Sequence, residues 1–218
     1  MNERPSLRLV VLISGSGSNL QAIIDGCADG SIDAEVAAVI SNRPGVRGLQ
    51  RAAEANIPAE VVDHTGYDSR AAFERALTGR IDSHRPDLVI LAGFMRILTP
   101  KFVRHYAGRL LNIHPSLLPR FQGLHTHRRV LEAGDTEHGA SVHFVTEELD
   151  GGPVVLQAVV PVLAGDDADS LAARVLAQEH RIYPAVIQWI AAGRVRLDAQ
   201  QGVMFDGKPL PQPLRWTS

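Results

Sequence analysis

An asparagine and a histidine stand two residues apart in the segment 112–119, which reads NIHPSLLP. Asn112 and His114 follow the apolar pair Leu110 and Leu111, so we predict that they end a β-strand, where residues two apart share a face. An amide donor beside an imidazole suits acyl transfer, in which a carbonyl becomes an oxyanion that needs preorganised donors. The imidazole can also move a proton. The alternative is that both side chains only satisfy backbone groups at the strand end.

A carboxylate partner for His114 is expected further along the chain. Asp150 begins the sequence DGG at 150–152, and it is the best candidate to orient His114 and to raise its pKa. Aspartate followed by glycine is also ordinary turn chemistry, so Asp150 alone is weak evidence.

A cluster of histidines raises the question of a metal site. Five of them fall within residues 114–143, at His114, His125, His127, His138 and His143. No cysteine and no H-E-x-x-H pattern accompanies them, so we predict no metal and expect some of these histidines to line a cleft.

A glycine-rich loop, SGSGSN at 14–19, lies between an apolar run and a segment of helical period. Backbone N–H groups at the start of a helix can receive an anion, and we expect Ser18 or Asn19 to cap the helix and to donate to phosphate oxygens. The loop lacks the lysine of triphosphate-binding loops and the spacing of the dinucleotide fingerprint, which favours a phosphomonoester. The alternative is a tight turn without a ligand.

Short apolar runs alternate with segments of helical period, which predicts strands joined by crossover helices. The expected strands are 9–13, 36–40, 60–62, 88–91, 110–114, 140–146 and 154–161, and the expected helices are 19–29, 46–55, 69–84 and 169–192. The two strands after residue 140 are predicted to pair. We predict a single-domain, Rossmann-like α/β fold with a mostly parallel central sheet and helices on both faces. Its expected parts are a phosphate-binding half at 1–100, a catalytic half at 101–195 and a tail at 196–218.

Composition excludes several classes of protein. The chain has 218 residues, 45% of them hydrophobic and 21% charged, with a net charge of −2. These values are ordinary for a globular protein and give no broad attraction to nucleic acid or to acidic membranes. The single cysteine, Cys27, is expected in the core and not as a nucleophile. Residues 1–6 lack signal-peptide features, so we expect a cytoplasmic protein.

Several ordered motifs together identify a family. They are VLISGSGSNLQAIID at 11–25, LAGFMRIL at 91–98, the long segment LLNIHPSLLPRFQGLHTHRRVLEAGDTEHGASVHFVTEELDGGP at 110–153 and AQEHRIYP at 177–184. With these motifs the chain resembles the phosphoribosylglycinamide formyltransferases, a family of folate-dependent enzymes. The resemblance implies the purine-biosynthetic transfer of a formyl group from N10-formyltetrahydrofolate to the amine of glycinamide ribonucleotide, with no metal and no tightly bound cofactor.

The resemblance also implies roles for individual residues. Asn112, His114 and Asp150 occupy the family's catalytic positions. For glycinamide ribonucleotide, the matching residues are Gly17, Ser18 and Asn19 at the phosphate and Glu179 at the ribose. For the folate they are Arg70, Met95, Arg96, Ile97, Leu98 and Asn112, with residues 146–150 on the pterin side. From the residues alone, Phe94, Met95, Ile97 and Leu98 fit the end of a buried strand and the start of a helix equally well.

Two other functions use the same residues. A formyltetrahydrofolate hydrolase would pass the formyl group to water, and a non-catalytic phosphoribosyl- or folate-binding protein would bind without turnover. A tRNA-directed formyltransferase or a regulated hydrolase would carry a further domain, for which we expect no room here. We expect small-molecule partners only, and a monomer or a homodimer.

Overall fold

The computed structural model describes residues 6–216. It divides into two compact units that meet in the chain at Leu111 and Asn112. The predicted single-domain organisation stays a prediction, and most of the N-terminal segment without signal-peptide features lies outside the described residues. None of the helices among residues 6–216 is long and apolar enough to cross a membrane.

The first unit alternates strands and helices. Its elements are β1 (Leu7–Ile13), α1 (Ser18–Ala28), β2 (Ala34–Ser41), α2 (Arg47–Glu54), β3 (Ala59–Val61), the 3-10 turn η1 (His64–Gly66), α3 (Arg70–Ser83), β4 (Leu88–Leu91) and α4 (Pro100–His105). The strands are ordered β3-β2-β1-β4. All three pairs are parallel.

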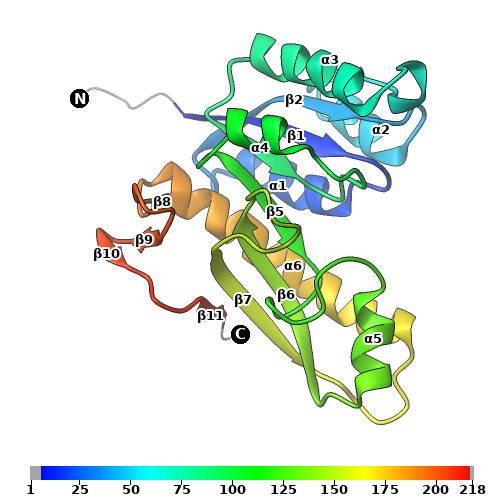
Figure 1. Ribbon diagram of the computed structural model, residues 1–218, viewed down its shortest axis with the longest axis vertical. Helices are drawn as coiled ribbons and strands as arrows, with labels where there is room; N and C mark the ends of the chain where they lie inside the picture. Colours follow the sequence, from blue (N-terminus) through cyan, green and yellow to red (C-terminus); the bar gives the residue numbers. More distant parts are fainter. Residues whose placement is uncertain (1–5, 217–218) are drawn as a thin grey trace. The chain divides into compact units, whose positions relative to one another are not determined.

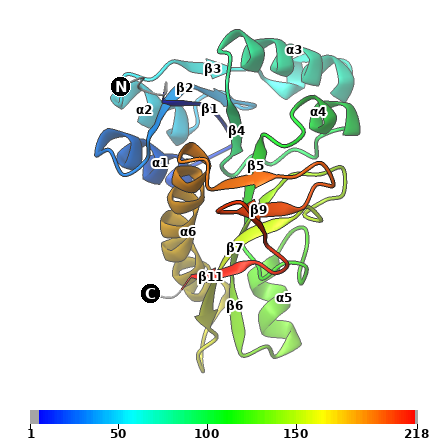
Figure 2. The same cartoon turned by 90° about the vertical axis from the view of Figure 1, so that its left-hand side faces the viewer.

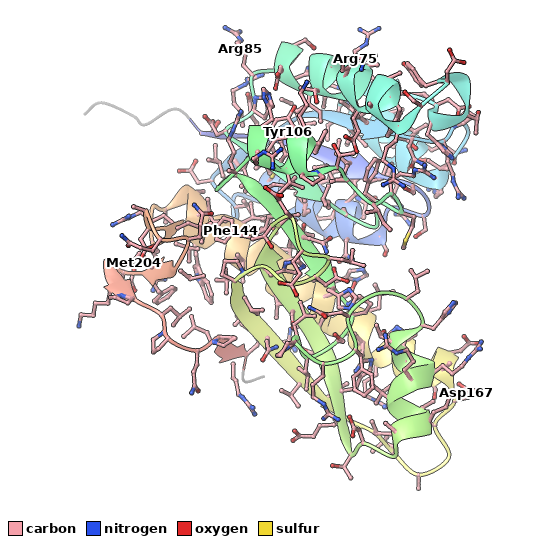
Figure 3. All side chains as sticks on the ribbon, in the orientation of Figure 1. Arg75, Arg85, Tyr106, Phe144, Asp167 and Met204 are labelled. Carbon is pink, nitrogen blue, oxygen red and sulfur yellow. The ribbon has the colours of Figure 1, made fainter. Side chains whose placement is uncertain are left out.

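Both faces of this sheet are covered. Residues 9–13 of β1 and 88–90 of β4 are almost completely buried, as expected for parallel strands between two helical layers. Figure 2 shows α1 and α2 on one side of the strands and α3 and α4 on the other. The fully buried Tyr106, labelled in Figure 3, donates its hydroxyl to Asp82 at 3.0 Å and so ties the end of α4 to α3.

The second unit contains a longer strand pair and a long helix. Its elements are β5 (Leu110–His114), which begins just before the division, α5 (Thr126–Ala133), β6 (Glu137–Phe144), β7 (Val154–Pro161), α6 (Ala168–Ala191), β8 (Val195–Leu197), β9 (Val203–Phe205), β10 (Lys208–Pro209) and β11 (Leu214–Trp216). The predicted pairing of β6 with β7 is confirmed and is antiparallel. Figure 1 shows α6 running along these two strands.

Short strands near the end of the chain are a feature that the sequence did not predict. Strands β8, β9 and β10 form a small antiparallel sheet. Strand β11 then pairs with β7 in parallel, and Leu214 lies beside Leu156. The predicted fold class, α/β with mostly parallel strands and covering helices, is confirmed.

Close approach between β6 and β7 predicts a difference between two glycine substitutions. A Cβ atom at Gly139 would lie 1.9 Å from the carbonyl oxygen of Ala158, whereas one at Gly79, exposed on α3, would meet nothing within 4 Å. We expect Gly139→Ala to lower the free energy of unfolding by about 1–3 kcal/mol. Gly79→Ala should raise it by roughly 0.5–1 kcal/mol. Urea unfolding measures both, and equal effects would contradict the packing described.

Candidate active site

The glycine loop of the first unit leads from β1 into α1. Gly17 is the N-cap of α1 and has a left-handed backbone with φ of 69°. The expectation that Ser18 or Asn19 caps this helix is therefore wrong, because both lie inside its first turn. A cap without a side chain leaves the first backbone N–H groups of α1 open toward an anion.

The start of α2 supports this loop. The backbone N–H of Gly48 donates to the carbonyl of Gly15 at 3.1 Å, and a Cβ atom at Gly17 would lie 2.7 Å from the Cα of Gly48. Arg51 donates from Nε to the carbonyl of Ser16 at 2.9 Å. A cation thus stands at the loop, although the loop itself contains none.

Ser14 connects the loop to the segment that follows β4. Its buried hydroxyl donates to Asn42 Oδ1 at 2.5 Å and accepts the backbone N–H of Met95 at 2.8 Å. With both interactions made, the Ser14 hydroxyl holds the loop in place and is not a free phosphate donor. It links the end of β1 to the first residue of the expected folate segment 95–98.

The segment 95–98 is mostly not part of the core. Met95 and Ile97 are 63% and 60% exposed, whereas Phe94 before them is buried. Large apolar side chains left open in this way fit a ligand wall better than the end of a buried strand. Thr99 fixes the far end of the segment, because its backbone N–H donates to the buried Glu74 of α3 at 2.8 Å. Arg70 is the exposed first residue of the same helix.

The second unit brings the three expected catalytic residues together. His114 and Asp150 are both nearly buried, with Nδ1 of the ring 3.4 Å from Oδ2 of the carboxylate. The other ring nitrogen, Nε2, donates to the carbonyl of Phe121 at 3.0 Å. Both ring nitrogens thus face oxygen atoms of the protein. Oδ2 of Asp150 also accepts the backbone N–H of Gly123 at 2.9 Å.

Asn112 is oriented by a histidine that sequence reasoning did not single out. His143 Nδ1 donates to the carbonyl of Phe144 at 3.0 Å, and burial lowers the pKa of His143 to about 4. The ring is therefore neutral near pH 7, and its Nε2 must be an acceptor. Nδ2 of Asn112 lies 3.1 Å from it and donates. One N–H of the Asn112 amide is thereby used, and the other stays available.

The arrangement holds side chains of the types that acyl transfer uses. An imidazole held by a carboxylate, together with an amide donor on the same strand, can stabilise an oxyanion. The formyl transferase family model matches residues 7–187. The chain belongs to the formyl transferase family.

Sequence and structure comparisons with individual formyl transferases support this assignment. The chain is 58% identical to phosphoribosylglycinamide formyltransferase of Escherichia coli (strain K12), over 94% of this chain and 96% of that protein. It is 49% identical to the protein of the same name from Haemophilus influenzae, with the same coverage. A solved phosphoribosylglycinamide formyltransferase from Coxiella burnetii, in complex with CHES, superimposes with a TM-score of 0.92 at 49% identity, over 97% of this chain and 100% of that one. The expected resemblance and the expected enzyme class are confirmed.

The remaining predicted site residues lie in several elements. Gly17, Ser18 and Asn19 form the start of α1, and Glu179 is buried in α6. Sequence reasoning missed Gly48 and Arg51. It named His143 only as one of a histidine cluster and Ser14 only as part of the loop 14–19, and it predicted neither the contact of His143 with Asn112 nor the two hydrogen bonds of the Ser14 hydroxyl. Their partners are far away in the sequence, and only the closeness of His143 to other histidines could have drawn attention to it.

The protonation states of other titratable side chains of this formyl transferase are set by burial. Cys27 is half-buried and is not in the core, contrary to expectation. Its partial burial raises the pKa of the thiol to about 11, so the thiol is protonated near pH 7 and is no nucleophile. Burial lowers the pKa of His138 to about 4, and its Nε2 lies 3.0 Å from Nδ1 of His127. Within residues 6–216, no group of three histidine, cysteine or acidic side chains is placed to hold a metal ion.

The low pKa of His143 predicts a pH-dependent contribution to stability. The unfolded chain binds a proton at this histidine near pH 6.5, whereas the folded chain does so only near pH 4. Protonation therefore favours unfolding as the pH falls between these values, and the stability present above pH 6.5 is lost toward pH 4. We expect His143→Gln to remove about 3 kcal/mol of this pH dependence.

Urea unfolding of the wild type and the variant between pH 7 and about pH 4 measures this difference. His138→Gln is the matched comparison, because the pKa of His138 is lowered to a similar value by burial. It should also flatten the dependence. Identical pH dependence in the wild type and both variants would contradict the burial of neutral rings.

Proposed function

We propose that this formyl transferase moves the formyl group of N10-formyltetrahydrofolate onto the amine of glycinamide ribonucleotide, a step of de novo purine biosynthesis. The observation that carries the proposal is the arrangement in which Asn112 and His114 share the end of β5 and Asp150 contacts the imidazole. The two relatives that carry the name of this activity align with nearly the whole chain.

The proposed chemistry uses the N–H donors of His114 and Asn112 that can face a substrate. The neutral amine attacks the formyl carbon, and the formyl oxygen takes up negative charge. His114 Nε2–H and the second N–H of Asn112 stabilise this oxyanion, with the substrate oxygen replacing the carbonyl of Phe121 on Nε2. A proton passes from the attacking nitrogen to N10 of the folate, and the bond between N10 and the formyl carbon then breaks. Asp150 keeps His114 oriented throughout.

The two substrates are assigned to different residues. For glycinamide ribonucleotide, we propose that Gly17, Ser18 and Asn19 receive the phosphate and that Glu179 binds the ribose hydroxyls. The guanidinium of Arg51 supports the phosphate loop through Ser16. For the folate, we propose contacts from Arg70, Met95, Arg96, Ile97, Leu98 and Asn112. The proposal includes no metal and no tightly bound cofactor, a monomer or homodimer, and a cytoplasmic location.

One assay separates this proposal from the two other functions. The protein is mixed with N10-formyltetrahydrofolate, with and without glycinamide ribonucleotide, and deformylated folate is followed. Release that depends on glycinamide ribonucleotide supports the proposal. Equal release without it indicates a hydrolase, and binding without release indicates a non-catalytic protein.

Loss of the imidazole should be severe. We expect His114→Ala to lower kcat by about 10²–10³-fold with both substrates saturating, which is the scale of losing a principal oxyanion donor. His105→Ala, which changes a half-exposed histidine on α4, is the control and should leave kcat unchanged. Near wild-type turnover of His114→Ala would refute the assigned role.

The phosphate loop predicts a change specific to one substrate. In Gly17→Ala the new methyl group would meet Gly48 at a backbone with positive φ, so the loop must shift. We expect KM for glycinamide ribonucleotide to rise by at least about tenfold, the loss of one charge-assisted hydrogen bond, while KM for the folate stays within twofold. Gly66→Ala, which meets nothing within 4 Å, is the control. A similar rise in both KM values would argue against a phosphate role for this loop.

A further inference from the structure

The backbone at Asp150 has a conformation that needs support. Asp150 has a left-handed φ of 50°, which is uncommon for a residue with a side chain. Two glycines follow it, and glycine places little restraint on its own backbone. The peptide unit between Asp150 and Gly151 could therefore rotate, and the carboxylate would then swing away from His114.

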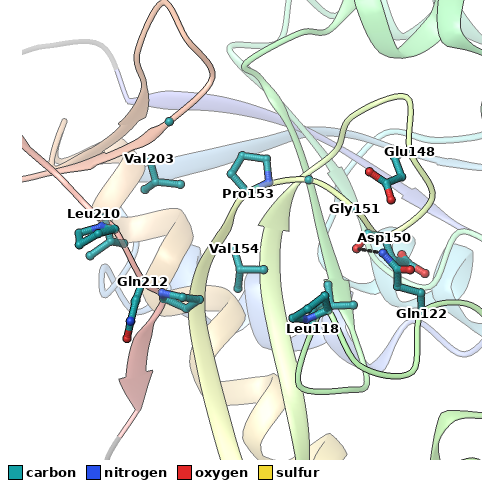
Figure 4. Close-up of a pocket in the computed structure, with 15 residues that line it drawn as sticks. Leu118, Gln122, Glu148, Asp150, Gly151, Pro153, Val154, Val203, Leu210 and Gln212 are labelled. Atoms are coloured by element: carbon teal, nitrogen blue, oxygen red, sulfur yellow. Dashed lines mark hydrogen bonds between the residues drawn. The ribbon is translucent and has the colours of Figure 1, made fainter.

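Two hydrogen bonds from adjacent residues oppose this rotation. The side-chain amide of Gln122 donates to the backbone carbonyl of Asp150 at 3.2 Å, a bond drawn in Figure 4. The backbone N–H of Gly123 donates to the carboxylate Oδ2, the same oxygen that faces His114. One bond holds the main chain and the other holds the side chain.

We infer that Gln122 is a positioning residue for formyl transfer, which fixes the backbone of Asp150 and thereby the orientation of its carboxylate toward His114. This inference rests on the proposed function. Gln122 touches no reacting atom in this arrangement, so it acts only through Asp150.

Gln122 can do this because its own segment is held at several points. Arg129 of α5 donates to the backbone carbonyl of Gln122 and lies over the ring of Phe121, 5.5 Å from its centre. Ser116 Oγ donates to the carbonyl of Arg120 at 2.7 Å, and Ser141 of β6 donates to the carbonyl of Ser116 at 2.6 Å. The side-chain amide thus starts from a fixed backbone.

The surroundings of Gln122 make it suitable for substitution. Its side chain lines a pocket of about 540 Å³, together with Leu118, Glu148, Val154, Leu210 and Gln212. Figure 4 shows Gln122 and Asp150 on one side of this pocket and the C-terminal segment on the other. A change at Gln122 therefore leaves the packed core intact, and the variants should fold.

The test compares two unbranched side chains that differ in hydrogen-bond donors. Gln122→Met removes the donor, and we expect kcat to fall about three- to tenfold, the effect of one neutral hydrogen bond, with both KM values within twofold. Gln122→Lys keeps a donor and should restore most of the loss. Gln212→Met, at a glutamine that lines the same pocket, is the control and should leave kcat within twofold.

A second background distinguishes positioning from general disturbance. In an Asp150→Asn enzyme, the rate is measured in single turnover with excess enzyme. Adding Gln122→Met should lower this rate only slightly further, because the effects of substitutions at interacting residues are not additive. The inference is overturned if Gln122→Met lowers the rate of the Asp150→Asn enzyme by the same factor as that of the wild type. It is also overturned if Gln122→Met and Gln122→Lys are equally slow.

A structural readout keeps this result separate from the proposed function. The NMR signal of the Gly123 amide reports the bond to Asp150 without any substrate. It should move in Gln122→Met and return toward the wild-type position in Gln122→Lys. If the signal moves but the enzyme does not transfer formyl groups to glycinamide ribonucleotide, the proposed function is refuted and the positioning role of Gln122 is not. If the signal does not move in Gln122→Met, the positioning role is overturned.

Discussion

The candidate active site depends on the hydrogen-bond and ionic partners of one buried carboxyl group. Asp150 is almost withdrawn from solvent, and a buried polar group without partners is strongly unfavourable. Its partners come from separate parts of the chain, because His114 ends β5 and Gly123 lies in the loop before α5. Pairing this carboxylate with its partners therefore brings the strand end, the loop and the turn after β6 to one place. The arrangement of the candidate catalytic residues is a consequence of that requirement.

In the first unit, close backbone packing holds the glycine loop in place. Gly17 and Gly48 approach more closely than side chains would allow, and Ser14 joins three segments with one hydroxyl. These contacts leave the phosphate loop little freedom. If the loop receives the phosphate as proposed, its backbone N–H groups need not be ordered first, which lowers the entropic cost of binding.

The sequence predicted those features that depend on local pattern. Apolar runs such as 88–91 marked buried strands, and the alternation of Asn112 and His114 placed both side chains on one face. Partners that depend on tertiary structure were not predictable in this way. His143 looks like any strand residue until its ring is seen beside Asn112. The strand β11 is only three residues long and follows prolines, so its pairing with β7 left no periodic signal.

Backbone carbonyl groups decide the chemistry of the site as much as side chains do. The carbonyl of Phe144 fixes the tautomer of His143, which in turn decides which end of the Asn112 amide points at it. The carbonyl of Phe121 accepts from His114 at the nitrogen that a substrate oxygen would use. Both carbonyls are placed by the conformation of the chain and not by residue type. The loop at 121–123 therefore shapes the surroundings of His114 and Asp150 through its own backbone groups, whatever side chains it carries.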